Sequence, residues 1–128
     1  MRLDVFVIST ALALAPSMTA AEPASDPMFG NDPHAKAVLD CHAGYAHRFA
    51  AALTSTRATP TEIATAAYAH CIGQLNDFAQ AVAVSAWASK DPGVFLDPRK
   101  YQDEQVARMR EHSFAYTLDT YLKLSSAL

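Results

Sequence analysis

Each of the two cysteines in the chain has a histidine beside it, as Cys41-His42 and His70-Cys71. These are the side chains whose types and spacing could do the most chemistry. With reduced thiols they would form the Cys2His2 set of donors that zinc prefers. Adjacent helical residues point about 100° apart, however, and zinc sites usually separate paired ligands by at least two residues. The interpretation that we favour is a disulfide between Cys41 and Cys71, with the two histidines nearby.

Other kinds of chemistry find less support in the sequence. The alternative function is metal binding by His42 and His70 beside the cysteine pair. His34, His47 and His112 have no partner at a fixed spacing, so we interpret them as surface or boundary residues. Haem-attachment, nucleophile-elbow, P-loop and dinucleotide patterns are absent from the sequence, and no serine or threonine has a histidine placed to activate it. We therefore expect no catalytic activity and no cofactor.

The first residues have the pattern of a secretory signal. A weakly basic start, Met1-Arg2, precedes an apolar run over 5–15, and the small residues Thr19-Ala20-Ala21 follow as a cleavage site. The apolar run is shorter than the roughly 20 residues of a membrane-spanning helix. We therefore predict a cleaved signal peptide over 1–21 and a periplasmic or secreted protein. An oxidising compartment of this kind favours the disulfide.

The rest of the chain predicts a leader and one helical domain. Residues 22–31 contain prolines, a glycine and small polar residues, which are typical of a flexible leader. Residues 32–128 have the length of a single domain. Three helix starts in this stretch share one pattern, a capping residue followed by proline: Asp32-Pro33, Thr59-Pro60 and Asp97-Pro98. From these starts we predict helices over 33–56, 60–89 and 98–125, and hence an all-α, three-helix domain.

The apolar stripes of the first two predicted helices place the cysteines face to face. These stripes are Val38, Cys41, Tyr45 and Phe49 in the first helix and Ile63, Ala67, Cys71 and Phe78 in the second. If the chain turns near Thr56, the antiparallel pairing that joins the cysteines also brings Phe49 close to Ile63. We therefore predict a disulfide-tied antiparallel helical hairpin, with the third helix packed across it.

Aromatic residues are the remaining candidates for recognition. After a turn over 90–93, the apolar strap Val94-Phe95-Leu96 is expected to pack on the core. Trp87, Phe95, Tyr116 and Tyr121 could then line an apolar groove for a peptide or a lipid.

Charge and hydropathy narrow the class of partner. The formal net charge is −3 and the sequence has no basic run, which argues against nucleic acid as a partner. No second apolar run after the signal is long enough to span a membrane. The sequence thus predicts a small exported binding or structural protein without catalytic activity, whose partner is an unidentified protein, peptide or lipid.

Overall fold

The computed structural model describes residues 29–52 and 58–126, and these residues are helical without strands. The helices are α1 (Pro33–Ala51), α2 (Pro60–His70), α3 (Ile72–Ala88), α4 (Pro92–Phe95) and α5 (Pro98–Ser126). The all-α class is therefore confirmed for this part of the chain. The predicted signal peptide, most of the predicted leader and the turn near Thr56 lie outside the described residues.

The helix starts are where the capping residues predict them. The carboxylate of Asp32 caps α1, and Asp97 Oδ1 accepts the Lys100 amide at 3.0 Å at the start of α5. At α2, the Thr59 hydroxyl accepts the Glu62 amide at 3.2 Å, and the Glu62 carboxylate accepts the Thr59 amide at 2.7 Å. This reciprocal pair is the predicted capping box. Because a cap uses only neighbouring residues, it can be recognised in the sequence before the fold is known.

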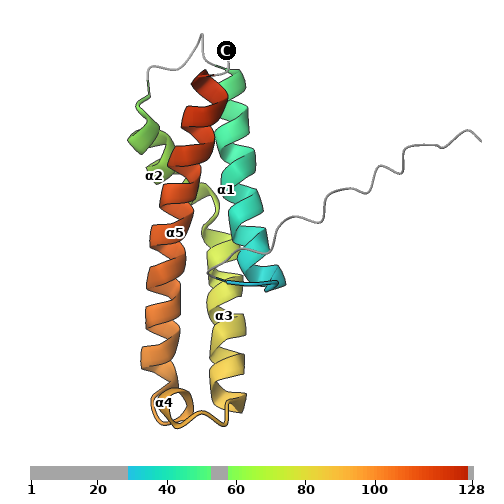
Figure 1. The fold of residues 1–128 in the computed structure, drawn as a ribbon, viewed down its shortest axis with the longest axis vertical. Coiled ribbons are helices and arrows are strands. Elements are labelled where there is room, and N and C mark those ends of the chain that lie inside the picture. Colours follow the sequence, from blue (N-terminus) through green and yellow to red (C-terminus); the bar gives the residue numbers. More distant parts are fainter. Residues whose placement is uncertain (1–28, 53–57, 127–128) are drawn as a thin grey trace, which may run out of the picture.

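The second predicted helix, 60–89, is wrong as a single element, because the chain bends at Cys71 between α2 and α3. The backbone of Cys71 has φ −98° and ψ 15°, in the bridge region of conformational space rather than the helical one. Hydrogen bonding continues through the bend, since the Cys71 amide still donates to Ala67 and the Leu75 amide to Cys71. Figure 1 shows α2 leaning away from the axis of α3.

The longest helix, α5, is the element on which the others pack. It runs along the whole length of the molecule, beside α1 near the C-terminal end and beside α3 near the opposite end (Figure 1). It also contacts α2. The bend at Cys71 therefore lets both halves of the broken helix pack against α5.

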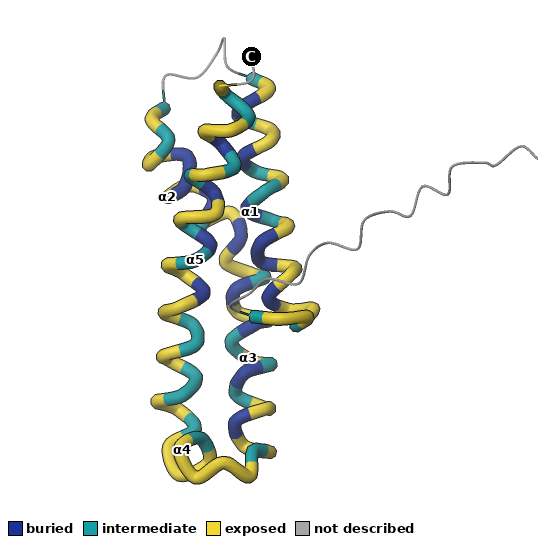
Figure 2. The backbone as a smooth tube through the Cα atoms, in the orientation of Figure 1, coloured by how far each residue is buried: buried dark blue, intermediate teal, exposed yellow. Residues whose placement is uncertain are grey.

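Buried positions lie along the facing sides of the helices over most of their length (Figure 2). They include two apolar clusters, with a polar layer between them in the order of the residues along α1 and α5. The lower cluster, toward α4, comprises Ala35, Val38, Leu39, Leu75, Phe78, Val82 and Met109. The upper cluster, toward the C-terminus, comprises Ala46, Ala50, Ile63 and Tyr121. The polar layer between them consists of His42, Ser113 and Thr117, all at most 2 % exposed.

The buried face of α1 differs from the predicted stripe, and the buried face of α5 is partly polar. On α1 the core face contains His42, Ala46 and Ala50, whereas Cys41, Tyr45 and Phe49 are only partly buried. The buried face of α1 is therefore rotated around the helix relative to the predicted stripe, and the polar residue His42 lies at the centre of the buried face. On α5 the buried row is Met109, Ser113, Thr117 and Tyr121, so two of its four positions are occupied by the small polar residues serine and threonine.

The apolar strap is also wrong in its expected packing. Phe95 is 42 % exposed and Leu96 is 74 % exposed, so neither side chain is buried in the core. The segment instead forms the single turn α4, with Asp91 Oδ1 accepting the Gly93 amide at 2.9 Å. None of the described helices combines the length and the apolar character that crossing a bilayer requires.

Candidate functional site

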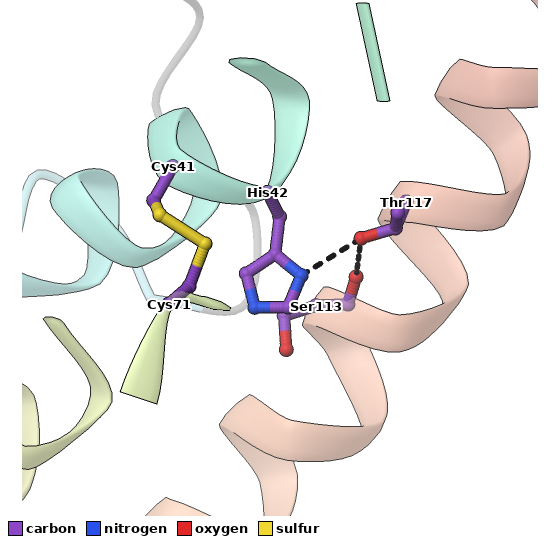
Figure 3. Close-up of a disulfide and its surroundings, with 5 residues drawn as sticks. All are labelled: Cys41, His42, Cys71, Ser113 and Thr117. Carbon is purple, nitrogen blue, oxygen red and sulfur yellow. Dashed lines mark hydrogen bonds between the residues drawn. A yellow bond between two sulfur atoms is a disulfide. The ribbon is translucent and has the colours of Figure 1, made fainter. Parts of the chain in front are cut away.

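The predicted disulfide between Cys41 and Cys71 is confirmed. The two Cα atoms are 5.9 Å apart, within the normal range for a disulfide. The bond ties the middle of α1 to the bend between α2 and α3, at the level of the polar layer (Figure 3). Cys71 is fully buried, whereas Cys41 is partly exposed.

His42 follows Cys41 and points into the core toward α5 (Figure 3). Its Nδ1 atom lies 2.9 Å from the hydroxyl oxygen of Thr117. The Thr117 hydroxyl in turn donates to the backbone carbonyl of Ser113 at 2.7 Å, and the Ser113 hydroxyl donates to the carbonyl of Arg110 at 3.2 Å. A chain of hydrogen bonds therefore starts at His42 on α1 and ends in the backbone of α5.

We infer from this chain of hydrogen bonds which imidazole nitrogen carries the proton. Thr117 has one hydroxyl hydrogen, and the Ser113 carbonyl, which can only accept, receives it. The hydroxyl oxygen of Thr117 can then only accept from His42, so Nδ1 is the protonated nitrogen. Burial lowers the pKa of His42 below its ordinary value, which favours the neutral ring. The second nitrogen, Nε2, is therefore a hydrogen-bond acceptor with a free lone pair.

A cavity of about 500 Å³ lies beside this histidine, between α1, α2 and α5. Its lining residues are His42, Thr65, Tyr68, Ala107, Arg110, Glu111, Ser113 and Phe114. Among the described residues, Nε2 of His42 has no hydrogen-bond partner. Every fully buried side-chain nitrogen or oxygen in this part of the chain has a partner, so Nε2 cannot be fully buried. The open space that it can reach is the cavity.

The charged groups of the cavity lie at its rim. The guanidinium carbon of Arg110 is 4.9 Å from the ring centre of Tyr68, a cation–π contact. Arg110 and the neighbouring Glu111 are both exposed. Tyr68 and Phe114 are partly buried, and the buried polar residues of the lining are His42 and Ser113. The Ser113 hydroxyl already donates to the Arg110 carbonyl, whereas Nε2 of His42 has no partner among the described residues.

The two histidines proposed as metal ligands lie in different surroundings. His42 is buried against Thr117, whereas His70 is exposed and its ring lies 5.2 Å from the ring of Tyr45. Within the described ranges, no group of three or more histidine, cysteine, aspartate or glutamate side chains could hold a metal ion. The symmetry of the sequence around the cysteines is therefore not matched by symmetry of the two imidazole environments.

The structure does not bring the four predicted groove residues together. Tyr121 is buried in the upper cluster, whereas Trp87 is 76 % exposed and shares a surface hollow with Gln102 of α5. Gln102 and Tyr121 are separated by roughly 28 Å along the axis of α5, at the usual rise per residue. Phe95 is in α4, and Tyr116, on α5, is 37 % exposed. One groove cannot include both Trp87 and Tyr121.

The sequence interpretation missed Thr117, whose hydroxyl is the partner of His42, and Ser113, whose backbone carbonyl accepts from Thr117. A stripe of apolar residues alone does not include these two hydroxyl residues. Ser113 and Thr117 continue a series with a step of four residues that starts at Met109 and ends at Tyr121. Because residues four apart share one face of a helix, this series indicates that the two hydroxyl residues lie on the same face as Met109 and Tyr121. His42 likewise lies four residues from both Val38 and Ala46, which are both buried.

No family model, curated protein or solved structure matches this chain. The cavity beside His42 is the strongest candidate, because it combines an apolar interior with a buried polar group that has a free acceptor site.

Proposed function

We propose that this protein is a small exported helical protein that binds a ligand and catalyses no reaction. The cavity beside His42 is its binding site. Export is supported by the signal-like sequence of 1–21 and by the Cys41–Cys71 disulfide, because disulfides persist mainly in oxidising compartments. In this interpretation the disulfide-tied helical hairpin, with α5 packed on it, is the scaffold that holds the cavity.

The observation that carries the proposal is the composition of the cavity. Binding sites for small molecules are typically concave and mainly apolar, with a few well-placed polar groups. The cavity has a volume of about 500 Å³, which is within the common range for such sites, and Tyr68 and Phe114 contribute aromatic surface. Nε2 of His42 is a polar group whose position is held by a hydrogen bond on the other side of the ring.

The same geometry favours binding over catalysis. A histidine base needs a nucleophile within reach and a partner that stabilises the charged ring. The Ser113 hydroxyl donates to the Arg110 carbonyl rather than to the imidazole. Nδ1 of His42 is paired with the neutral hydroxyl of Thr117 rather than with a carboxylate, so nothing in this chain of hydrogen bonds stabilises an imidazolium ion.

The proposal is tested by asking whether small molecules occupy this cavity. Protein purified from the exported fraction is screened by NMR with a set of neutral, cationic and anionic fragments. We expect some fragments to shift the amide signals of Tyr68, Arg110 and Phe114. Filling the cavity with Ala107→Trp should abolish those shifts, because Ala107 lines it.

The matched control is Ala115→Trp, which places the same side chain on α5 at an exposed position that does not line the cavity. This variant should bind the fragments as the wild type does. Shifts that survive Ala107→Trp, or a screen in which no fragment perturbs the cavity signals, would contradict the proposed function.

A further inference from the structure

We propose that the cavity binds an uncharged, mainly aromatic molecule that donates one hydrogen bond to Nε2 of His42, with a phenolic hydroxyl as the simplest such donor. This inference rests on the proposed binding function and specifies the chemistry of the ligand. It follows from three properties of the site, which are the direction of the hydrogen bonds, the placement of the charges and the nature of the walls.

The direction of the hydrogen bonds makes the deep end of the cavity an acceptor. The carbonyl of Ser113 takes the Thr117 hydrogen, and Thr117 takes the Nδ1 hydrogen of His42. If the Thr117 hydroxyl donated to Nδ1 instead, its oxygen would lie 2.7 Å from the Ser113 carbonyl oxygen with no hydrogen between them. Nε2 therefore presents a lone pair, and a ligand can satisfy it only with an O–H or N–H group.

The placement of the charges argues against an ionic ligand. Burial keeps the His42 ring neutral by lowering its pKa, so the ring does not attract a carboxylate, and its lone pair repels one. Among the described lining residues, Arg110 is the one arginine or lysine; it is exposed and rests on the ring of Tyr68. Glu111, the next residue, has the opposite charge and is also exposed, so neither charge occupies the buried end.

The walls favour a flat apolar body. Tyr68 and Phe114 contribute aromatic rings and Ala107 contributes a methyl group. Aromatic rings pack well against one another in offset or edge-to-face arrangements. A ligand that combines an aromatic ring with one hydroxyl fits both the apolar walls and the acceptor at the buried end.

The test compares three probes that share one body. These are p-cresol, which has the hydroxyl donor, 4-methylanisole, in which a methyl group replaces the donated hydrogen, and p-toluate, which is an anion. Dissociation constants are measured by NMR titration of the oxidised protein at pH 7.5. We expect p-cresol to bind about tenfold more tightly than 4-methylanisole, because the ether leaves Nε2 without a partner. The p-toluate anion should bind more weakly than p-cresol.

Variants at Thr117 test whether the hydrogen-bond chain sets this preference. Thr117 does not line the cavity, so Thr117→Val leaves the lining residues unchanged. It removes the acceptor of Nδ1–H, together with the hydrogen bond from Thr117 to the Ser113 carbonyl, and frees the ring to change its tautomer. The preference for p-cresol should fall toward equality, while 4-methylanisole binds as before. Thr117→Ser retains the hydroxyl and should restore the preference.

The possible results separate this inference from the proposed function. Equal binding of p-cresol and 4-methylanisole in the wild-type cavity would overturn the donor inference and leave the binding function standing. Tighter binding of p-toluate would do the same and assign recognition to Arg110. If none of the three probes shifts the cavity signals while other fragments of the screen do, the donor inference is overturned and the binding function stands. If no fragment of the screen shifts them either, both proposals are contradicted.

Discussion

Breaking the disulfide should be the most costly single chemical change to this fold. Cys41 and Cys71 are separated by 30 residues. In the chain-entropy description, closing a loop of this length stabilises a protein by about 3.6 kcal/mol, because it restricts the unfolded chain. Small domains have only about 5–15 kcal/mol of stability in total. For a domain of this size the loss corresponds to a decrease in Tm of roughly 15–25 °C.

The loss should be concentrated in one part of the molecule. The bond lies between the two apolar clusters, and among residues 29–52 and 58–126 the buried centre of the upper cluster comprises Ala46, Ala50, Ile63 and Tyr121. The lower cluster is larger and joins α1, α3 and α5 without help from the bond. On reduction we therefore expect hydrogen exchange to accelerate more in α2 than in α3.

The measurement is thermal and urea unfolding, followed by circular dichroism, of oxidised and fully reduced protein. The double variant Cys41→Ala/Cys71→Ala should resemble the reduced protein and, as a control, should not respond to reductant. Its stability should be slightly lower still, because the fully buried Cys71 leaves a small void. The reasoning is refuted if protein shown by mass spectrometry to be fully reduced melts within about 3 °C of the oxidised form.

Three further predictions concern the histidine, a helix cap and export. Because burial lowers the pKa of His42 in the folded state, the unfolded chain binds this proton more tightly. The urea midpoint should therefore decrease as the pH falls from above about 6.5 through the lower folded pKa, and the His42→Gln variant should lose much of this dependence. Thr59→Ala removes the capping box and should cost about 1 kcal/mol in urea unfolding, whereas the exposed Thr61→Ala should cost much less. Mass spectrometry of protein from its native host should find a mature N-terminus at Ala21 or Glu22; recovery of the intact Met1 end would reject export by cleavage.

The parts of the fold that depend on neighbours in sequence could be predicted. Caps at Asp32, Thr59 and Asp97 act over two or three residues, so they marked the helix starts before any packing was known. The disulfide was predictable for a similar reason, because two cysteines in an exported chain have few alternatives. The bend at Cys71 carried no such mark. No proline or glycine occupies that position, and the helical hydrogen bonds continue through it.

The candidate site shows the same division between local and distant causes. The sequence by itself determined the helical class, the helix starts and the cysteine pair, since each depends on local hydrogen bonding or on a small choice of partners. Only the tertiary structure decided that His42 is buried, that His70 is exposed, and that Trp87 and Tyr121 lie far apart. The partner that holds His42 is Thr117, at a sequence separation of 75 residues on another helix. A contact between residues so far apart in the sequence depends on how α1 and α5 pack. The spacing of apolar residues within either helix does not indicate which residues of the two helices will meet.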